Sequence, residues 1–172
     1  MALADGLPTV FGLPAHPLLV HAVVVLLPLS ALAAAALAIV PRWRQRHAWP
    51  LLGVTLLAVG SVLPAQKAGE QLHERLAALG NPLIERHAEL GNDLLPFALG
   101  FGVLVVALLV AGRLADRERT AAADDADVPR TWRRISIVVA VLVIAAGAAV
   151  TVQTVRIGHS GSTAVWDGVG QN

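Results

Sequence analysis

LLVHAVVVLLPLSALAAAALAIV occupies residues 18–40 and contains no Asp, Glu, Lys or Arg. At ~1.5 Å of helix rise per residue, such a stretch is long enough to cross the hydrocarbon core of a bilayer. Its apolar residues form a block and do not recur at the period of an amphipathic helix or strand, which is typical of a membrane span. Three further stretches also lack these four residue types: Trp49–Ala65, Leu94–Gly112 and Ile135–Val155.

The composition agrees with a membrane protein. Hydrophobic residues make up 56% of the 172 residues and charged residues only 15%, more apolar surface than a soluble domain of this size could bury. The net charge of +1 gives no case for nucleic-acid binding. The chain has no cysteine, which excludes disulfides, thiolate zinc sites, iron–sulfur ligation by Cys and c-type haem attachment. Any metal or haem must therefore be held by His, carboxylates or backbone.

We expect one all-α transmembrane domain over residues 1–172, built as a four-transmembrane-helix bundle. The segment 113–134 is expected to be a solvated cytoplasmic linker, because its middle is rich in Ala and Asp. The four spans are expected at about 17–40, 49–79, 82–112 and 134–157.

The connection between the second and third spans carries a stop-and-restart signal, Gly80-Asn81-Pro82. Glycine ends one helix, asparagine caps the next and proline takes its first position. The second and third helices should therefore extend beyond the outer membrane face as an antiparallel pair. His87 shares a helical stripe with Leu83, Leu90 and Leu94, so it should face the bundle.

Arginine and lysine predict the orientation. The connections after the first and third spans hold nine of these residues and the opposite side holds four, which places the arginine-rich connections in the cytoplasm and both termini outside. We expect a multi-pass protein of the bacterial inner membrane. Tryptophans flank the inner ends of the spans, where an aromatic belt is expected: Trp43, Trp49 and Trp132.

Five of the six histidines fall at similar heights on the outer side. Measured from the inner end of each span, four of them, one per helix, lie at nearly equal distances, and His21 lies somewhat less far along; the four are His16, His73, His87 and His159. At the helical rise per residue, all five fit in a slab of roughly 9 Å. Because imidazole binds metals and haem iron, this ring of histidines is a candidate site.

The leading hypothesis is a b-type haem that transfers electrons at the outer face, with a quinone or a redox complex as partner. His21 and His87 are the preferred axial pair, with His159 and His73 as alternates and His16 nearby. Basic residues near the same level are candidates to pair with the propionates: Lys67, Arg75, Arg86 and Arg156. No nucleophile–base pair is evident, so a stand-alone enzyme is not expected.

Two alternatives stay open. One is a membrane module that binds Zn, Cu or Fe, in which Glu70 and His73 share a helix face through their Glu-x-x-His spacing; its candidate ligands are His21, His87, His159, His73 and Glu70. The other is a cofactor-free structural or assembly subunit, because histidine also tolerates membrane interfaces. The bilayer is a partner in every case, and oligomerisation is possible.

Four motifs carry a family resemblance: HPLLVH at 16–21, PAQKAGE at 64–70, RHAELG at 86–91 and GHSGSTAVW at 158–166. Together they resemble a bacterial family of four-span membrane proteins that carries a domain-of-unknown-function label. The resemblance covers nearly the whole chain and implies a polytopic membrane protein without an established activity. The layout is more loosely similar to that of small membrane cytochromes b, whose four-helix bundles hold haem between histidines. The chain departs from them in having His47 alone near the cytoplasmic ends, which argues against a second haem there.

Overall fold

A computed structural model describes residues 9–10, 13–76, 78, 80–124 and 130–167. The elements follow the order β1 (Thr9–Val10), β2 (Leu13–Pro14), α1 (Ala15–Ile39), η1 (Pro41–Trp43), α2 (Arg44–Leu76), α3 (Pro82–Asn92), α4 (Leu94–Asp124) and α5 (Thr131–Trp166). Apart from the two-residue antiparallel pair of β1 and β2, all of these elements are helical, and the expected all-α bundle is confirmed.

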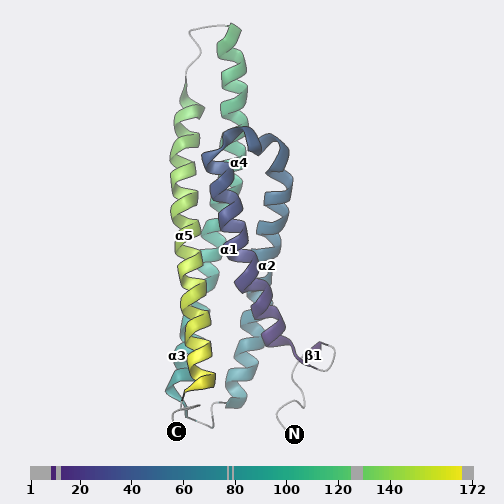
Figure 1. Ribbon diagram of the computed structural model, residues 1–172, viewed down its shortest axis with the longest axis vertical. Coiled ribbons are helices and arrows are strands. Elements are labelled where there is room, and N and C mark those ends of the chain that lie inside the picture. Colours follow the sequence, from purple (N-terminus) through teal and green to yellow (C-terminus); the bar gives the residue numbers. More distant parts are fainter. Residues whose placement is uncertain (1–8, 11–12, 77, 79, 125–129, 168–172) are drawn as a thin grey trace.

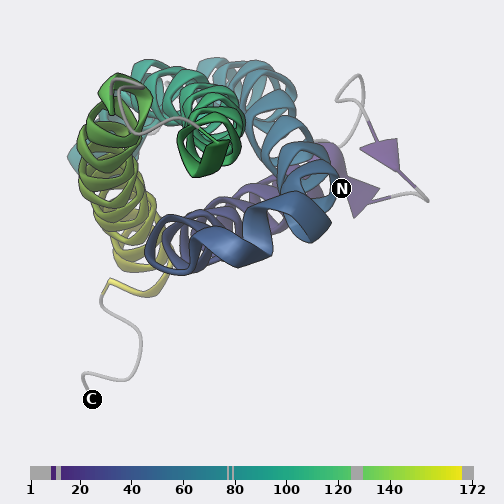
Figure 2. The same cartoon turned by 90° about the horizontal axis from the view of Figure 1, so that it is seen from above.

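The long helices form a ring. α1 packs against α2 and α5, and α4 also packs against α2 and α5, whereas few contacts join α1 to α4 across the middle. Figure 2 shows this ring along the bundle axis. α3 lies at one end of the bundle between α2 and α5, and α1 begins and α5 ends at that same end (Figure 1). We call it the terminal end and call the opposite end, which carries η1, the arginine end.

The ring is packed by apolar side chains of moderate size. Phe101, Leu27 and Leu108 are fully buried on its inner side. A methyl group placed at Gly147 would lie 3.2 Å from the Cβ of Ala31, so this glycine lets α5 approach α1 closely. The outer side is apolar as well, since Leu32, Leu57 and Val103 are each more than 60% exposed. A surface of this kind suits contact with lipid.

Four helical segments are long and apolar enough to cross a membrane: His16–Ile39, Pro41–Leu76, Pro82–Ala123 and Thr131–Trp166. The connection between the second and third follows the sequence signal. Gly80 has a φ of +58°, and the Asn81 side chain accepts a hydrogen bond of 2.9 Å from the amide of Leu83. Pro82 is the first residue of α3. The predicted glycine stop, asparagine cap and proline start are confirmed.

The segment 113–134, expected to be a solvated linker, is helical over most of its described residues. α4 continues to Asp124 and α5 begins at Thr131, and residues 125–129 lie outside the described part of the chain. Ala, Arg and Glu are strong helix formers, and Asp116 pairs with Arg119 at 3.0 Å. The carboxylate of Glu118 accepts hydrogen bonds from the backbone amides of Trp132 and Arg133 at 3.1 and 2.8 Å, which caps the start of α5.

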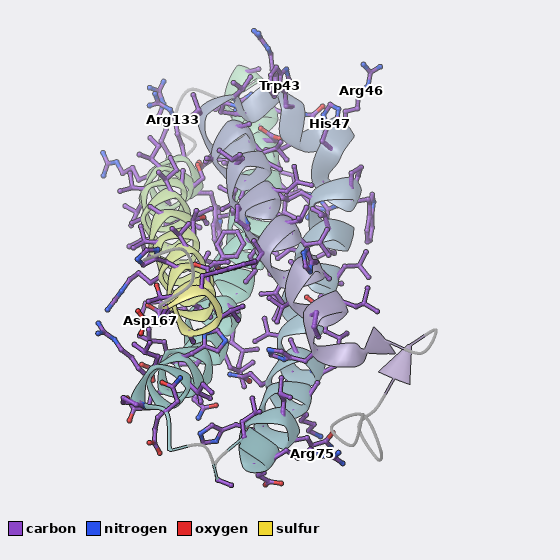
Figure 3. All side chains as sticks on the ribbon, turned by 60° about the horizontal axis from the view of Figure 1, so that its bottom comes forward. Trp43, Arg46, His47, Arg75, Arg133 and Asp167 are labelled. Atoms are coloured by element: carbon purple, nitrogen blue, oxygen red, sulfur yellow. The ribbon has the colours of Figure 1, made fainter. Side chains whose placement is uncertain are left out.

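At the arginine end, one arginine is buried while its neighbours are exposed. The guanidinium of Arg44 donates to the carbonyls of Leu37 and Ala38 at 2.8 and 3.0 Å, the last turn of α1, whose carbonyls have no partner in their own helix. A methyl group placed at Gly112 would lie 3.0 Å from this side chain. Figure 3 shows Trp43, Arg46 and His47 at the same end, far from Arg75 and Asp167.

We predict that Arg44→Ala destabilises the bundle. The substitution leaves the carbonyls of Leu37 and Ala38 without their donors, which should lower the free energy of unfolding by about 2 kcal/mol or more. Thermal unfolding in detergent, followed by circular dichroism, measures the change. Arg46→Ala is the matched control, because Arg46 is exposed, and it should change stability by about 0.5 kcal/mol at most. Equal stabilities of the two variants would contradict this role for Arg44.

Candidate functional site

The terminal end encloses a half-open cavity of about 720 Å³. Its walls come from α1, α2, α3 and α5 and from the first residue of α4, and most of the side chains on them are apolar, including Val20, Val62 and Ile157. Four histidines line it, one from α2, one from α3 and two from α1: His16, His21, His73 and His87. The predicted convergence of histidines from several helices therefore holds for four of the five.

His16 is seated on α2. Its Nδ1 lies 3.2 Å from the carbonyl oxygen of Ala65. A methyl group placed at Gly69 would lie 3.0 Å from its Cε1 atom, so the absence of a side chain at Gly69 makes room for the ring. Both Ala65 and Gly69 belong to PAQKAGE, and His16 belongs to HPLLVH. The two motifs therefore meet across the α1–α2 interface.

His87 is seated on α5 in a parallel way. Its Nδ1 lies 3.0 Å from Oγ of Ser160, and a methyl group placed at Gly161 would lie 2.9 Å from its Cε1. The RHAELG and GHSGSTAVW motifs thus meet across the α3–α5 interface. His87 is half-buried, so the prediction that it faces the bundle is confirmed. His16 and His87 also lie close enough for a charge on one ring to act on the other.

His21 and His73 line the same cavity with fewer constraints. His21 is exposed, and its Nδ1 donates to the carbonyl of Pro17 in the preceding turn. His73 is half-buried on α2. Of the two histidines expected to form the axial pair, His87 is therefore held by a neighbouring helix, whereas His21 is held by its own.

Several predicted site residues lie away from the cavity wall. His159 is exposed on α5 and does not line the cavity; in its motif, Ser160 and Gly161 make the contacts with His87. Arg75, Arg86 and Arg156 are also absent from the wall, and Arg156 instead donates to the side chain of Gln153 at 3.4 Å.

The charged groups on the described wall of the cavity are carboxylates: Glu70, Glu85 and Glu89. The described wall therefore carries no arginine or lysine that could pair with haem propionates, although the sequence led us to expect one. Within the described residues, no group of three or more His, Asp or Glu side chains is arranged to hold a metal ion. Glu70 and His73 both line the cavity, but they are not part of a group of three or more possible metal ligands among the described residues.

A break between α3 and α4 positions the wall that carries His87. Pro96 has no amide hydrogen, so it cannot bond to the carbonyl of Asn92, four residues earlier. The side chain of Gln66 donates to the carbonyls of Gly91 and Asn92 at 2.8 and 3.3 Å. Gln153 donates to the carbonyl of Leu90 at 3.2 Å. Two glutamines, from α2 and α5, thus satisfy the backbone at the break and hold α3 in place.

Sequence reasoning did not identify these supporting residues. Ser160, Gly161, Gly69 and the two glutamines all contact a histidine or the α3 backbone, but no local pattern names their partners. A signal was present in the four motifs, since four of the five residues lie within them and only Gln153 does not. The presence of motifs with histidine beside motifs with glycine indicates that these motifs pack against each other, but the sequence does not show which motif contacts which.

Comparison with known proteins places the chain among membrane proteins. A family model described as "Predicted membrane protein (DUF2231)" matches residues 12–172. No curated protein and no solved structure matches the chain.

We predict that Gln153→Leu loosens α3. The carbonyl of Leu90 would lose its donor, which should cost about 1 kcal/mol and raise the amide hydrogen-exchange rates of α3 above those of α4. Thr151→Val is the control, because Thr151 bonds to the carbonyl of Gly147 within α5 itself, and it should leave exchange in α3 unchanged. If α3 exchanges equally slowly in both variants, Gln153 does not hold it.

Proposed function

The chain belongs to the DUF2231 family of predicted membrane proteins, and from that premise we propose that it binds a b-type haem in the terminal cavity and transfers electrons there. His16 and His87 are the proposed axial ligands. The observation that carries the proposal is the matched seating of these two rings: each is anchored through Nδ1 to a neighbouring helix and packed on a glycine, and both line one cavity.

The number of available ligands favours haem. A closed metal site needs three or four protein donors, and no such group of His, Asp and Glu occurs among the described residues. A haem iron takes four donors from the porphyrin and needs two axial ligands from the protein. A pair of imidazoles from facing walls is sufficient for that purpose.

The cavity also suits a flat apolar group. A volume of about 720 Å³ with mainly apolar walls lies in the range of small-molecule and cofactor sites. His16 is preferred over the expected His21 because it is half-buried and bonded to α2, whereas His21 is exposed. An axial ligand held by the fold needs less ordering when the iron binds.

A second candidate is a Zn, Cu or Fe ion, which the carboxylates on the wall favour. Glu70, Glu85 and Glu89 would attract a cation and repel propionates. Such an ion would need His16 or His87 together with a carboxylate that moves toward it. Metal content separates the two candidates, because a bound ion without porphyrin leaves the protein without the haem bands.

The proposed electron transfer requires a partner at the terminal end, either a quinone in the bilayer or a redox complex. We place the protein in the bacterial inner membrane with the arginine end in the cytoplasm and the terminal end outside. The positions of Trp43 and Arg46 at the arginine end support this orientation (Figure 3).

We predict that the protein purified from haem-replete cells gives a sharp low-spin b-type band in the reduced-minus-oxidised spectrum. His87→Ala and His16→Ala should each abolish the low-spin band, because each removes an axial ligand. His159→Ala is the matched control, since His159 does not line the cavity, and its spectrum should equal that of the original protein.

Three outcomes contradict parts of this proposal. A colourless protein from haem-replete cells rejects haem binding. A low-spin band that survives His16→Ala and disappears in His21→Ala replaces the proposed pair with His21 and His87. One equivalent of a transition metal without porphyrin, measured by mass spectrometry, favours the metal candidate.

We also predict opposite accessibilities for the two ends of the bundle. The chain has no cysteine, so a single introduced cysteine is the only thiol that a maleimide can label. Ala78→Cys at the terminal end should react with a membrane-impermeant maleimide in intact cells. Ala121→Cys, on the exposed surface of α4, should react only after permeabilisation. The reverse pattern would invert the proposed orientation.

A further inference from the structure

We propose that Ser160 and the carbonyl of Ala65 are positioning groups that fix the tautomer of His87 and His16. They hold both rings protonated at Nδ1, so that two unprotonated Nε2 atoms face the cavity before any ligand binds. This deepens the proposed function and rests on it for its purpose, because a haem iron or metal ion binds the lone pair of a neutral imidazole nitrogen.

The proton of His87 can be located from its neighbours. The hydroxyl of Ser160 has one proton, and its Oγ lies 2.8 Å from the carbonyl oxygen of Ile157. A carbonyl oxygen accepts hydrogen bonds and donates none, so the hydroxyl proton lies between these two oxygens. The Oγ atom is then an acceptor toward His87, whose Nδ1 lies 3.0 Å away. The Nδ1 atom must carry the proton.

The case of His16 is simpler. Its Nδ1 lies 3.2 Å from the carbonyl oxygen of Ala65, and this contact is a hydrogen bond only if Nδ1 is the donor. His16 and His87 thus reach the same protonation pattern through different partners, one a backbone carbonyl of α2 and the other a side chain of α5.

The glycine seats set the direction of each ring. A methyl group at Gly161 would lie 2.9, 3.2 and 3.5 Å from Cε1, Nδ1 and Nε2 of His87. A methyl group at Gly69 would lie 3.0, 3.3 and 4.0 Å from the same atoms of His16. In both rings the Nδ1–Cε1–Nε2 edge meets the seat, with Cε1 nearest to it and Nε2 the farthest of these three atoms.

The Nδ1 atom anchors each ring. Within the described part of the chain, the hydrogen bonds of His16 and His87 to Ala65 and Ser160 are both made at Nδ1, the backbone of Ile157 also lies beside the ring of His87, and both rings line the cavity. Metal-ligating histidines generally donate their other ring nitrogen to a carbonyl or a similar acceptor, which fixes tautomer and orientation. The same arrangement occurs here twice, on opposite walls.

Nitrogen-15 NMR of the histidine-labelled protein, prepared without haem or metal, tests this inference. Protonated and unprotonated ring nitrogens have well separated shifts, and the signals of His87 and His16 are assigned from their loss in His87→Asn and His16→Asn. Both rings should be protonated at Nδ1. Ser160→Ala should shift the tautomer ratio of His87 about tenfold toward Nε2–H, and Ser160→Thr, which keeps the hydroxyl, should restore the original ratio.

Two matched controls separate positioning from general damage. Ser162→Ala removes a hydroxyl that bonds to the carbonyl of His159, and it should leave His87 unchanged. Gly161→Ala should displace the ring of His87 and shift its signals, whereas Gly158→Ala, where a methyl group meets nothing within 4 Å, should not.

An unchanged tautomer ratio in a folded Ser160→Ala protein, or an Nε2–H ring in the original protein, overturns the inference. The measurement is independent of haem. A colourless protein whose histidines show the expected tautomers rejects the proposed cofactor and leaves the positioning intact. A haem-containing protein in which Ser160→Ala changes neither the tautomer ratio nor the reduction potential supports the cofactor and rejects the positioning role.

Discussion

The need to give every backbone carbonyl a donor in an apolar surrounding governs this structure. Lipid tails offer no hydrogen bonds, so the free carbonyls at each helix end or break inside the bundle must accept a hydrogen bond from a side chain. Arg44 serves the end of α1, and Gln66 and Gln153 serve the break before α4. Each of these three polar side chains belongs to a different helix from the carbonyls that it satisfies, so the three side chains fix how the helices meet.

Much of the fold could be predicted from the sequence because its signals are local. Uncharged stretches predict spans, and Gly80-Asn81-Pro82 predicts a stop and a restart through backbone conformations that need no distant partner. The placement of His16, His73 and His87 at one end of the bundle follows from helical rise alone. The extension of α4 to Asp124 is harder to predict, because the Ala/Asp-rich middle of 113–134 is typical of a solvated linker, whereas the alanines and the Asp116–Arg119 pair favour helix.

The site could be predicted only in part, since its decisive contacts join residues far apart in the chain. The sequence indicates that histidines gather at one end, but it does not tell that Gly69 makes room for His16 or Gly161 for His87. It also does not separate His87, which faces α5, from His159, which lies beside the seat on α5 and points elsewhere. A one-residue difference in register decides between a wall residue and a surface residue, and that register depends on packing between helices.

The separation of α3 from α4 at Asp93 has a consequence for how such a protein can diversify. The membrane-crossing part of α4 and the wall that carries His87 are separate helices, which meet at Asp93. Substitutions on α3 can therefore reshape the chamber, its acidity or its opening without disturbing the hydrophobic thickness that the bilayer demands. Related proteins with this fold can in this way bind different ligands while their transmembrane helices stay the same.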